Sequence, residues 1–212
     1  HTLGSAVTHI HIGNGLHNLV YCGDYKFLRT QLLDQAVNRF PRVETLITES
    51  TYGGKDDIFP SRISCEDKII NLIKETKEKG GKVLIPVLGV GRSQEIMLIL
   101  EQAIREGKLE KLPIYIQGMV WDVTAIHTAY PDYLNKNVRK SIFHRDHNPF
   151  LSDIFMKVGS RKEQNQIIEE TGPCVIMATS GMMTAGASVE YFRRLADNPK
   201  NSLLFVNYLG EG

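Results

Sequence analysis

Short apolar runs alternate with longer amphipathic stretches over most of the 212-residue chain. Runs rich in Val, Ile and Leu are typical of strands buried in a parallel sheet, and the stretches between them have the spacing of crossover helices. The pattern therefore predicts an α/β fold with a mainly parallel sheet flanked by helices. The predicted strands are Thr45 to Thr48, Val83 to Leu88, Ile114 to Gln117, Val175 to Ala178 and Leu203 to Val206.

Helix start and stop residues bracket the amphipathic stretches. Ser160 and Glu163 form a capping box, in which each side chain accepts a hydrogen bond from a free backbone amide. Gly80 and Gly107 follow two other stretches and suit left-handed helix ends. The predicted helices are Ser61 to Lys79, Ser93 to Arg105, Gln164 to Glu170 and Ala187 to Ala196. The region from Met119 to Val158 is expected to be helical and irregular, with breaks near Pro131 and Pro149.

The N-terminal part has a different pattern. Residues 8–21 hold two β-like stretches around Gly13-Asn14-Gly15, a sequence that tolerates positive φ and suits a tight hairpin. We therefore expect a small strand segment over residues 1–44 beside an α/β domain over residues 45–212. Because the sequence begins with His1 and ends just after an apolar run, we also expect it to belong to a longer protein.

Composition narrows the classes of partner. Lys and Arg total 25 against 24 Asp and Glu, so the formal net charge is +1 and any polyanion has to be bound locally. Three scattered cysteines support neither a disulfide framework nor a Cys-rich zinc site, which indicates a reducing, cytoplasmic setting. The apolar runs are far shorter than the roughly 20 residues of a membrane helix, so no membrane partner is expected.

Polar residues and glycines follow several predicted strands. Ligands of open α/β sheets bind at the carboxyl ends of the strands, where loops and helix starts converge. Glu49 follows the first strand, residues 89–94 the second, and Thr179-Ser180-Gly181 the fourth. Glu49 alone is open to three interpretations, namely a solvated residue, a helix cap or a catalytic acid.

Gly91, Arg92 and Ser93 have the composition of a phosphate cradle. Glycine lets the backbone approach an anion, Ser93 is expected to cap the following helix, and Arg92 offers a planar fork of donors. The alternative is that the glycines merely turn the chain. A dinucleotide fingerprint needs a third glycine where Gln94 stands, so NAD and FAD are disfavoured. Ala178 stands where a nucleophile elbow needs glycine, which disfavours a serine hydrolase with Ser180.

Two pairs of histidines are candidate metal ligands. His9 and His11 alternate on a predicted strand and could chelate from one face, but an exposed strand face is the simpler interpretation. His144 and His147 lie in a charged, irregular stretch, where a solvated or hydrogen-bonded loop is the simpler interpretation.

Three ordered motifs carry a family resemblance. Residues 1–6 (HTLGSA), 21–25 (YCGDY) and 49–53 (ESTYG) resemble consecutive motifs of the β-CASP branch of the metallo-β-lactamase superfamily of nucleases. Residues 86–94, 179–183 and 205–212 resemble further β-CASP segments, so the resemblance covers nearly the whole chain. It is strongest to archaeal homologues of the cleavage and polyadenylation specificity factor, which process RNA 3′ ends.

The resemblance implies a site and a reaction. It makes His1 and Asp24 zinc ligands, with Asp24 bridging two Zn²⁺ ions in a complete centre, and it makes Glu49 a catalytic acid that orients a histidine. The implied reaction is hydrolysis of RNA phosphodiester bonds in 3′-end processing or transcription termination, by endonuclease action with 5′-3′ exonuclease action as a second mode. The other ligands would lie before His1 or after Gly212, so the segment alone is expected to be inactive.

The implied partner is single-stranded RNA. Its phosphates are expected to contact Gly91, Arg92, Ser93, Thr179, Ser180 and Gly181, and Tyr25 and Tyr52 are candidate platforms for base stacking. The resemblance further implies KH modules upstream and a homodimer. Two alternatives stay open. One is a zinc-independent α/β enzyme for a nucleotide or sugar phosphate, and the other is a non-catalytic RNA-binding β-CASP module.

Overall fold

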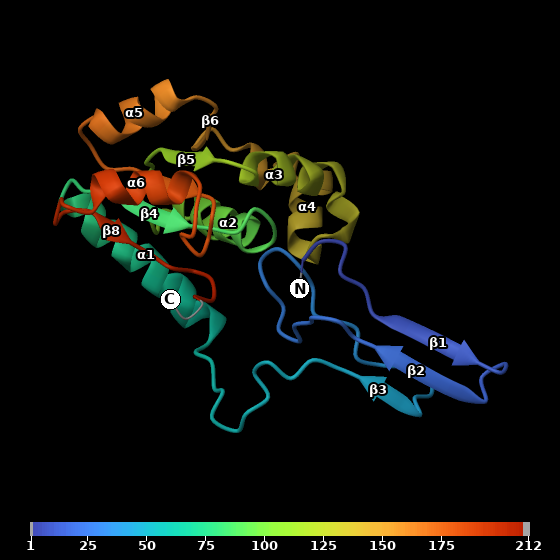
Figure 1. Ribbon diagram of the computed structural model, residues 1–212. Coiled ribbons are helices and arrows are strands. Elements are labelled where there is room, and N and C mark those ends of the chain that lie inside the picture. Colours follow the sequence, from blue (N-terminus) through green and yellow to red (C-terminus); the bar gives the residue numbers. More distant parts are fainter. Residues whose placement is uncertain (1, 210–212) are drawn as a thin grey trace.

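The computed structural model describes residues 2–209 and contains two β-sheets (Figure 1). The larger sheet has five parallel strands in the order β6-β5-β7-β4-β8, and the smaller has three in the order β1-β2-β3. The predicted α/β class, with a mainly parallel sheet flanked by helices, is thereby confirmed. The strands are β1 (Thr8–Ile12), β2 (His17–Tyr21), β3 (Thr45–Ile47), β4 (Val83–Pro86), β5 (Ile114–Gln117), β6 (Phe155–Val158), β7 (Val175–Ala178) and β8 (Ser202–Leu203).

Helices cover both faces of the larger sheet. Alternation along β4 divides the core, because Val83 and Ile85 pack in one hydrophobic cluster and Leu84 packs in the other. The first cluster lies under α1–α4, and the second lies under α5 and α6. The helices are α1 (Arg62–Glu78), α2 (Arg92–Arg105), α3 (Val120–Ala129), α4 (Lys136–His144), α5 (Arg161–Glu169) and α6 (Ala187–Leu195), with 3₁₀ turns η1 (Pro131–Tyr133) and η2 (Pro149–Leu151).

Several helix boundaries confirm the sequence prediction. Ser61 caps α1, where its side chain accepts a hydrogen bond from the backbone of Ser64. The capping box of Ser160 and Glu163 is present at the start of α5. Across residues 2–209, no helix combines the length and the apolarity that crossing a bilayer requires.

The edge strands depart from the prediction. Residues 155–158 form β6, although this stretch was expected to be helical or irregular. Its two central side chains are exposed, so it lacks the apolar run of a central strand. At the opposite edge, β8 pairs at Ser202 and Leu203 rather than over Leu203 to Val206.

The N-terminal sheet contains the predicted hairpin. β1 and β2 pair antiparallel, and Asn14 in the connecting turn has a φ of 56°, the left-handed conformation that the turn requires. The strand predicted at residues 45–48 forms as β3, but it pairs parallel with β2 in the small sheet, with Tyr21 opposite Ile47. The chain thus crosses from the small sheet to the larger one through residues 48–61 (Figure 1).

Candidate functional site

The carboxyl ends of β4, β5 and β7 meet at one edge of the larger sheet. A Cβ atom added at Gly118, after β5, would lie 2.3 Å from the hydroxyl oxygen of Thr179, after β7. A Cβ atom added at Gly181 would lie 2.9 Å from the backbone nitrogen of Leu88, after β4. Only residues without a side chain allow such approaches. The segments that the sequence placed at the strand ends are therefore in contact.

The turn before α2 is held by a buried glutamine. Gln94 Oε1 accepts a hydrogen bond from the Gly91 amide at 2.7 Å, and Gln94 Nε2 donates to the hydroxyl of Thr124 at 3.0 Å. Gly91, with φ 82°, is the N-cap, so the helix begins at Arg92 and the prediction that Ser93 caps it is wrong. The Ser93 side chain is fully buried, and its hydroxyl donates to the carbonyl of Gly89 at 3.2 Å.

Two cations lie together at the start of α2. The side chain of Arg92 is exposed and forms no ion pair with any of residues 2–209. Partial burial, and then the charge of Arg92, lower the pKa of the Lys26 ammonium. The charge of the nearby Glu95 carboxylate raises the same pKa, and Glu95 also accepts hydrogen bonds from the backbone amides of Gln31 at 2.8 Å and Leu32 at 2.7 Å. The arrangement leaves positive charge available for an anion.

The loop after β7 is fastened to the start of α6. The backbone amide of Ser188 donates to the carbonyl of Thr179 at 2.9 Å, and its hydroxyl donates to the carbonyl of Ser180 at 2.8 Å. The Ser180 hydroxyl accepts from the Thr184 amide at 3.2 Å. Within the described part of the chain, the Thr179 hydroxyl has no hydrogen-bond partner. This loop can therefore offer a hydroxyl from a fixed backbone.

Asp24 and Glu49 follow the carboxyl ends of two neighbouring parallel strands, β2 and β3. Tyr21 at the end of β2 lies opposite Ile47 at the end of β3, and Cys22 extends the pairing with a 3.0 Å hydrogen bond to the Ile47 carbonyl. Hydrogen bonds from Thr51, including its amide at 2.9 Å, lower the pKa of Glu49, and the Tyr25 amide adds to this effect. Glu49 therefore lies beside the residue that follows Asp24.

The described residues do not form a zinc centre. His1, one of the two predicted ligands, lies outside them, and Asp24 is exposed. Among residues 2–209, no three side chains of His, Cys, Asp or Glu come together as metal ligands. Because Zn²⁺ in proteins takes at least three protein ligands, Asp24 could be only one member of a set that this part of the chain leaves incomplete.

The other histidines have packing roles. The rings of His9 and His11 are 4.2 Å apart, and His11 Nδ1 shares a 2.6 Å hydrogen bond with Asn18 Oδ1. His9 also packs edge-on against Phe40. His147 Nε2 contacts the buried Glu101 carboxylate at 3.0 Å, as expected for a hydrogen-bonded loop.

The two candidate stacking residues have aromatic neighbours. The ring of Tyr25 lies 4.7 Å from that of Phe27, and the ring of Tyr52 lies 4.9 Å from that of Phe59. The Tyr52 side chain is exposed. Both tyrosines lie next to motif residues, one after Asp24 and the other three residues after Glu49.

Sequence reasoning missed Lys26 and Glu95. Lys26 stands two residues after Asp24, and Glu95 lies in the first turn of α2, where an acid is common at helix starts. Their proximity depends on how residues 26–36 pack against α2. Spacing along the chain does not report that packing, so no local signal could have paired them.

Comparison with known proteins settles the family. Residues 93–212, more than half of the chain, match the family model described as the Beta-Casp domain. The chain belongs to the β-CASP family. The resemblance to the β-CASP family is thus confirmed, and the matched region contains β5–β8, α3–α6 and all of α2 except Arg92.

The β-CASP relatives are archaeal proteins with one shared name. The chain is 54% identical over 212 residues to "Transcription termination factor FttA" of Methanocaldococcus jannaschii and to the protein of that name in Thermococcus kodakarensis. It is 53% identical to the one in Methanothermobacter thermautotrophicus. All of the chain is covered in each comparison, but only 33% of each relative. The chain thus spans about a third of the length of these relatives.

Proposed function

We propose that the whole protein is a zinc-dependent β-CASP ribonuclease that acts in transcription termination by hydrolysing RNA phosphodiester bonds. Family membership supports the reaction class, and the name of the relatives supports the role in transcription termination. The observation that carries the proposal for this chain is the edge where β4, β5 and β7 end, because it combines unpaired positive charge at Arg92 with a free hydroxyl at Thr179. Such a surface suits the phosphates of single-stranded RNA, which makes RNA the partner.

Within this surface the residues have different roles. We assign direct phosphate contacts to Arg92, Thr179, Ser180 and the backbone at Gly181. Gly91 and Ser93 are assigned to shaping the turn, since the Gly91 amide and the Ser93 hydroxyl are bonded inside the protein. Tyr25 and Tyr52 remain proposed stacking platforms.

Glu49 is proposed to position a catalytic group rather than to donate a proton. Its hydrogen bonds lower the pKa of the carboxyl group, so it is ionised at neutral pH and can only accept hydrogen bonds. An ionised carboxylate fixes the tautomer and orientation of a histidine that donates to it. The histidine itself would come from a part of the protein outside this chain.

Asp24 and His1 are proposed as members of a zinc site completed by the rest of the protein. When bound, Zn²⁺ would supply Lewis-acid stabilisation of the phosphoryl oxygens. Because the described residues do not complete a ligand set, we expect the 212-residue chain to be inactive by itself.

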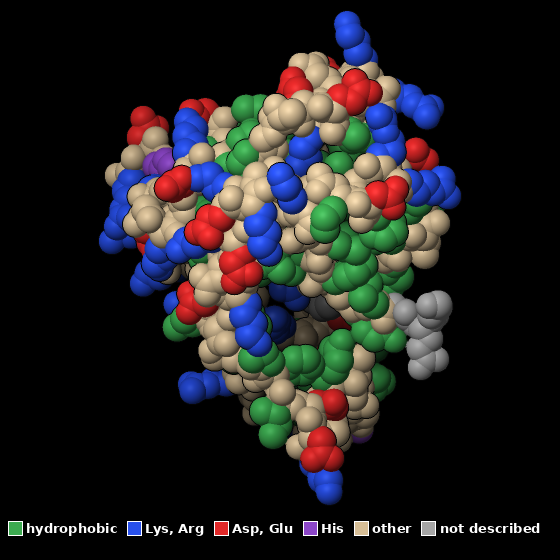
Figure 2. Space-filling model, turned by 90° about the vertical axis from the view of Figure 1, so that its left-hand side faces the viewer, with side chains coloured by type: hydrophobic (Ala, Val, Ile, Leu, Met, Phe, Trp, Pro, Cys, Tyr) green, Lys and Arg blue, Asp and Glu red, His purple; other side chains and the backbone are tan. Residues whose placement is uncertain are grey.

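Residues 1–44 are proposed to belong to an adjoining metallo-β-lactamase domain, and residues 45–212 to the β-CASP domain, with β3 at the boundary pairing with β2 in the small sheet. The small sheet exposes large apolar side chains, among them Ile12 (50%), Leu16 (80%) and Leu46 (56%). Figure 2 shows a hollow below the main body, edged by hydrophobic side chains, with Lys and Arg side chains inside it. Such apolar exposure suits a sheet that continues into further chain. We further propose that the whole protein carries KH modules upstream of this chain, forms a homodimer and is located in the cytoplasm.

The proposal is tested on the whole protein by zinc analysis together with cleavage of single-stranded RNA. Asp24→Asn is expected to lose both zinc and cleavage. Glu49→Gln is expected to lose cleavage while zinc content and RNA affinity stay at the wild-type level. A zinc-free protein that binds RNA without cutting it would support the non-catalytic module instead, and tight mononucleotide binding without RNA binding would support the nucleotide enzyme.

A further inference from the structure

A second hollow lies beside the phosphate-contacting edge, on the face of the larger sheet that α5 and α6 cover. It is an open, shallow hollow of about 480 Å³. It is lined from the ends of β5, β6 and β7 and from the starts of α5 and α6. Thr179 lines it as well, so the hollow adjoins the residues proposed to hold RNA phosphates.

Two side-chain amides in the wall of this hollow lack partners. Gln164 on α5 is only 8% exposed, and its Nε2 donor has no hydrogen bond within the described chain. Gln117 at the end of β5 has an Oε1 acceptor in the same state. Buried polar groups are usually hydrogen-bonded, so an unpaired donor and an unpaired acceptor in one wall require an explanation.

The fold sets both amides on the same side of the sheet. Along β5, Ile114 and Ile116 pack in the cluster under α1–α4, whereas Tyr115 packs in the cluster under α5 and α6. By alternation Gln117 lies on the side of Tyr115, facing α5. Gln117 also pairs in register with Val158, the last residue before the turn into α5.

The hollow is not built for an anion. The free amides at the start of α5 are already used, because Glu163 Oε2 accepts from Gly159 at 2.7 Å and from Ser160 at 3.2 Å. The carboxylate thereby fills the position that a phosphate would occupy at a helix start. Arg161 and Glu190, which also line the hollow, carry opposite charges.

Besides the Thr179 hydroxyl, the lining has an unpaired donor on Gln164 and an unpaired acceptor on Gln117, beside the aliphatic side chains of Val158 and Ala187. A neutral, flat group that presents an acceptor next to a donor would satisfy both amides, and the base-pairing edges of nucleobases have this property. Both amide atoms are covered in the free protein, so they would have to turn outward. The broad terminal torsion of glutamine then lets each amide present either its oxygen or its nitrogen to the base.

We propose that this hollow binds a nucleobase of single-stranded RNA through the side-chain amides of Gln117 and Gln164. The inference rests on the proposed RNA-binding function. It adds a site that contacts the base, whereas the adjoining edge, where β4, β5 and β7 end, is proposed to contact only phosphate. The neighbouring nucleotide would place its phosphate at Arg92 and Thr179.

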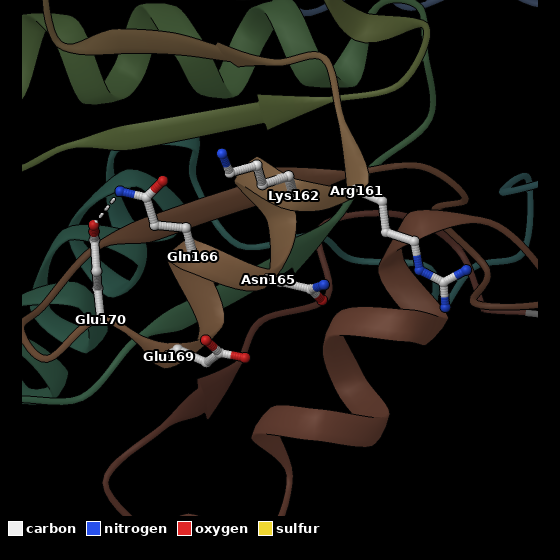
Figure 3. A pocket seen from close by; sticks show the side chains of 6 residues that line it. All are labelled: Arg161, Lys162, Asn165, Gln166, Glu169 and Glu170. Carbon is white, nitrogen blue, oxygen red and sulfur yellow. Dashed lines mark hydrogen bonds between the residues drawn. The ribbon is translucent and has the colours of Figure 1, made fainter.

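The test compares two glutamines of the same helix. Gln166 is exposed on the outer side of α5, where its amide donates to Glu170 at 2.6 Å in a shallow surface depression (Figure 3). Affinities are measured by fluorescence anisotropy for short oligo(A), oligo(C) and oligo(U) RNAs and for an abasic oligomer of equal length. The protein is the whole protein carrying Glu49→Gln, so that the RNA stays intact.

We expect Gln164→Leu to weaken binding of at least one base-containing oligomer about tenfold, the effect of losing a good amide-to-base contact. Gln166→Leu should bind every oligomer as its parent does, and the abasic oligomer should bind equally to all variants. Gln117→Leu is a second variant with the same expected result, and it replaces Gln164→Leu if thermal melting shows that the latter is unfolded.

Two results would overturn the inference alone. One is identical affinities for the Gln164→Leu and Gln166→Leu proteins with every base, and the other is an equal loss of affinity for the abasic oligomer. Failure of the parent protein to bind any of the oligomers would overturn the proposed RNA function as well, so the two failures are distinguishable.

Discussion

Glu95 Oε2 accepts a hydrogen bond from the backbone amide of Leu32 at 2.7 Å, and this bond joins the segment after Asp24 to the helix that begins with Arg92. Leu32 is 2% exposed, and Glu95 is 6% exposed. The neighbouring amide of Gln31 bonds to the other oxygen of the same carboxylate. One side chain therefore holds the segment that contains Lys26 in place beside the start of α2.

We predict that Glu95→Ala lowers the free energy of unfolding by about 2 kcal/mol, because two backbone amides lose their acceptor, one of them buried. Urea denaturation measures the change. Glu75→Ala, an exposed glutamate on α1, is the matched control and should change stability by less than about 0.5 kcal/mol. Equal effects of the two substitutions would contradict the clamping role of Glu95.

Arg92→Ala is predicted to weaken binding of single-stranded RNA for all sequences and to reduce the slope of log affinity against log salt by about 1, as expected for one lost phosphate contact. The measurement is a salt titration of RNA affinity with the whole protein. Lys162→Ala removes an exposed cation from α5 and is the control. An unchanged salt slope would remove Arg92 from the RNA-binding surface.

Gly118→Ala is predicted to be strongly destabilising, since the new Cβ atom would meet the Thr179 hydroxyl at 2.3 Å and φ is 91°. Gly107 has a similar backbone conformation, with φ 71°, but open space around its Cβ position. Its substitution therefore separates the cost of the backbone conformation from the cost of the contact. Gly107→Ala should cost about 1 to 2 kcal/mol for the backbone conformation alone, and Gly118→Ala should cost about 1 to 3 kcal/mol more.

A double-mutant cycle checks the cause. Adding Thr179→Ala to Gly118→Ala removes the clashing hydroxyl and should recover part of the lost stability, whereas adding Thr179→Ala to Gly107→Ala should recover none. If the two cycles give the same coupling, the contact between the β5 and β7 ends is not the source of the destabilisation.

His127 predicts a pH dependence of stability. The side chain is 1% exposed, and burial lowers its pKa below the ordinary value of 6.5. The neutral form is therefore favoured in the folded state, so its full contribution is present above pH 6.5 and is lost as the pH falls through the lowered pKa. His127→Gln should make the free energy of unfolding less dependent on pH below pH 6.5. His144→Gln replaces an exposed histidine and should leave that dependence unchanged.

Cys174 is predicted to resist alkylation. Burial raises the pKa of its thiol to about 11, so almost no thiolate exists at pH 8. Cys65 is exposed and should react with iodoacetamide much faster, which mass spectrometry of the folded protein can follow. Equal labelling of both residues in the native state would show that the second core cluster, under α5 and α6, opens readily.

The central strands were predictable because they are buried on both faces. β4 and β7 consist entirely of buried residues, and such runs are visible in the sequence. The edge strands were not, since β6 exposes Met156 and Lys157 and β8 pairs over only two residues. The apolar pattern of a sequence reflects burial, and these edge strands bury too few residues to produce a recognisable pattern.

The candidate site was predictable in part. Its glycines and hydroxyls follow the strands, so their meeting at one edge follows from parallel topology. The proposed roles of Asp24 and Glu49 rest on family resemblance. The cap at Gly91 was missed because the side chain that accepts a hydrogen bond at this helix start is that of Gln94, whereas Ser93 was expected to be the cap. The unpaired amides of Gln117 and Gln164 come from strand and helix packing, which spacing along the chain does not encode.

The parallel pairing of β2 with β3 governs how this region can tolerate change. Asp24 and Glu49 follow the same end of the small sheet because Tyr21 stands opposite Ile47. Residues inserted between positions 25 and 44 would leave this strand register unchanged. A slip of β3 by a single residue along β2 would instead turn Glu49 to the opposite side of the sheet, so one deletion there should be more damaging than several insertions upstream.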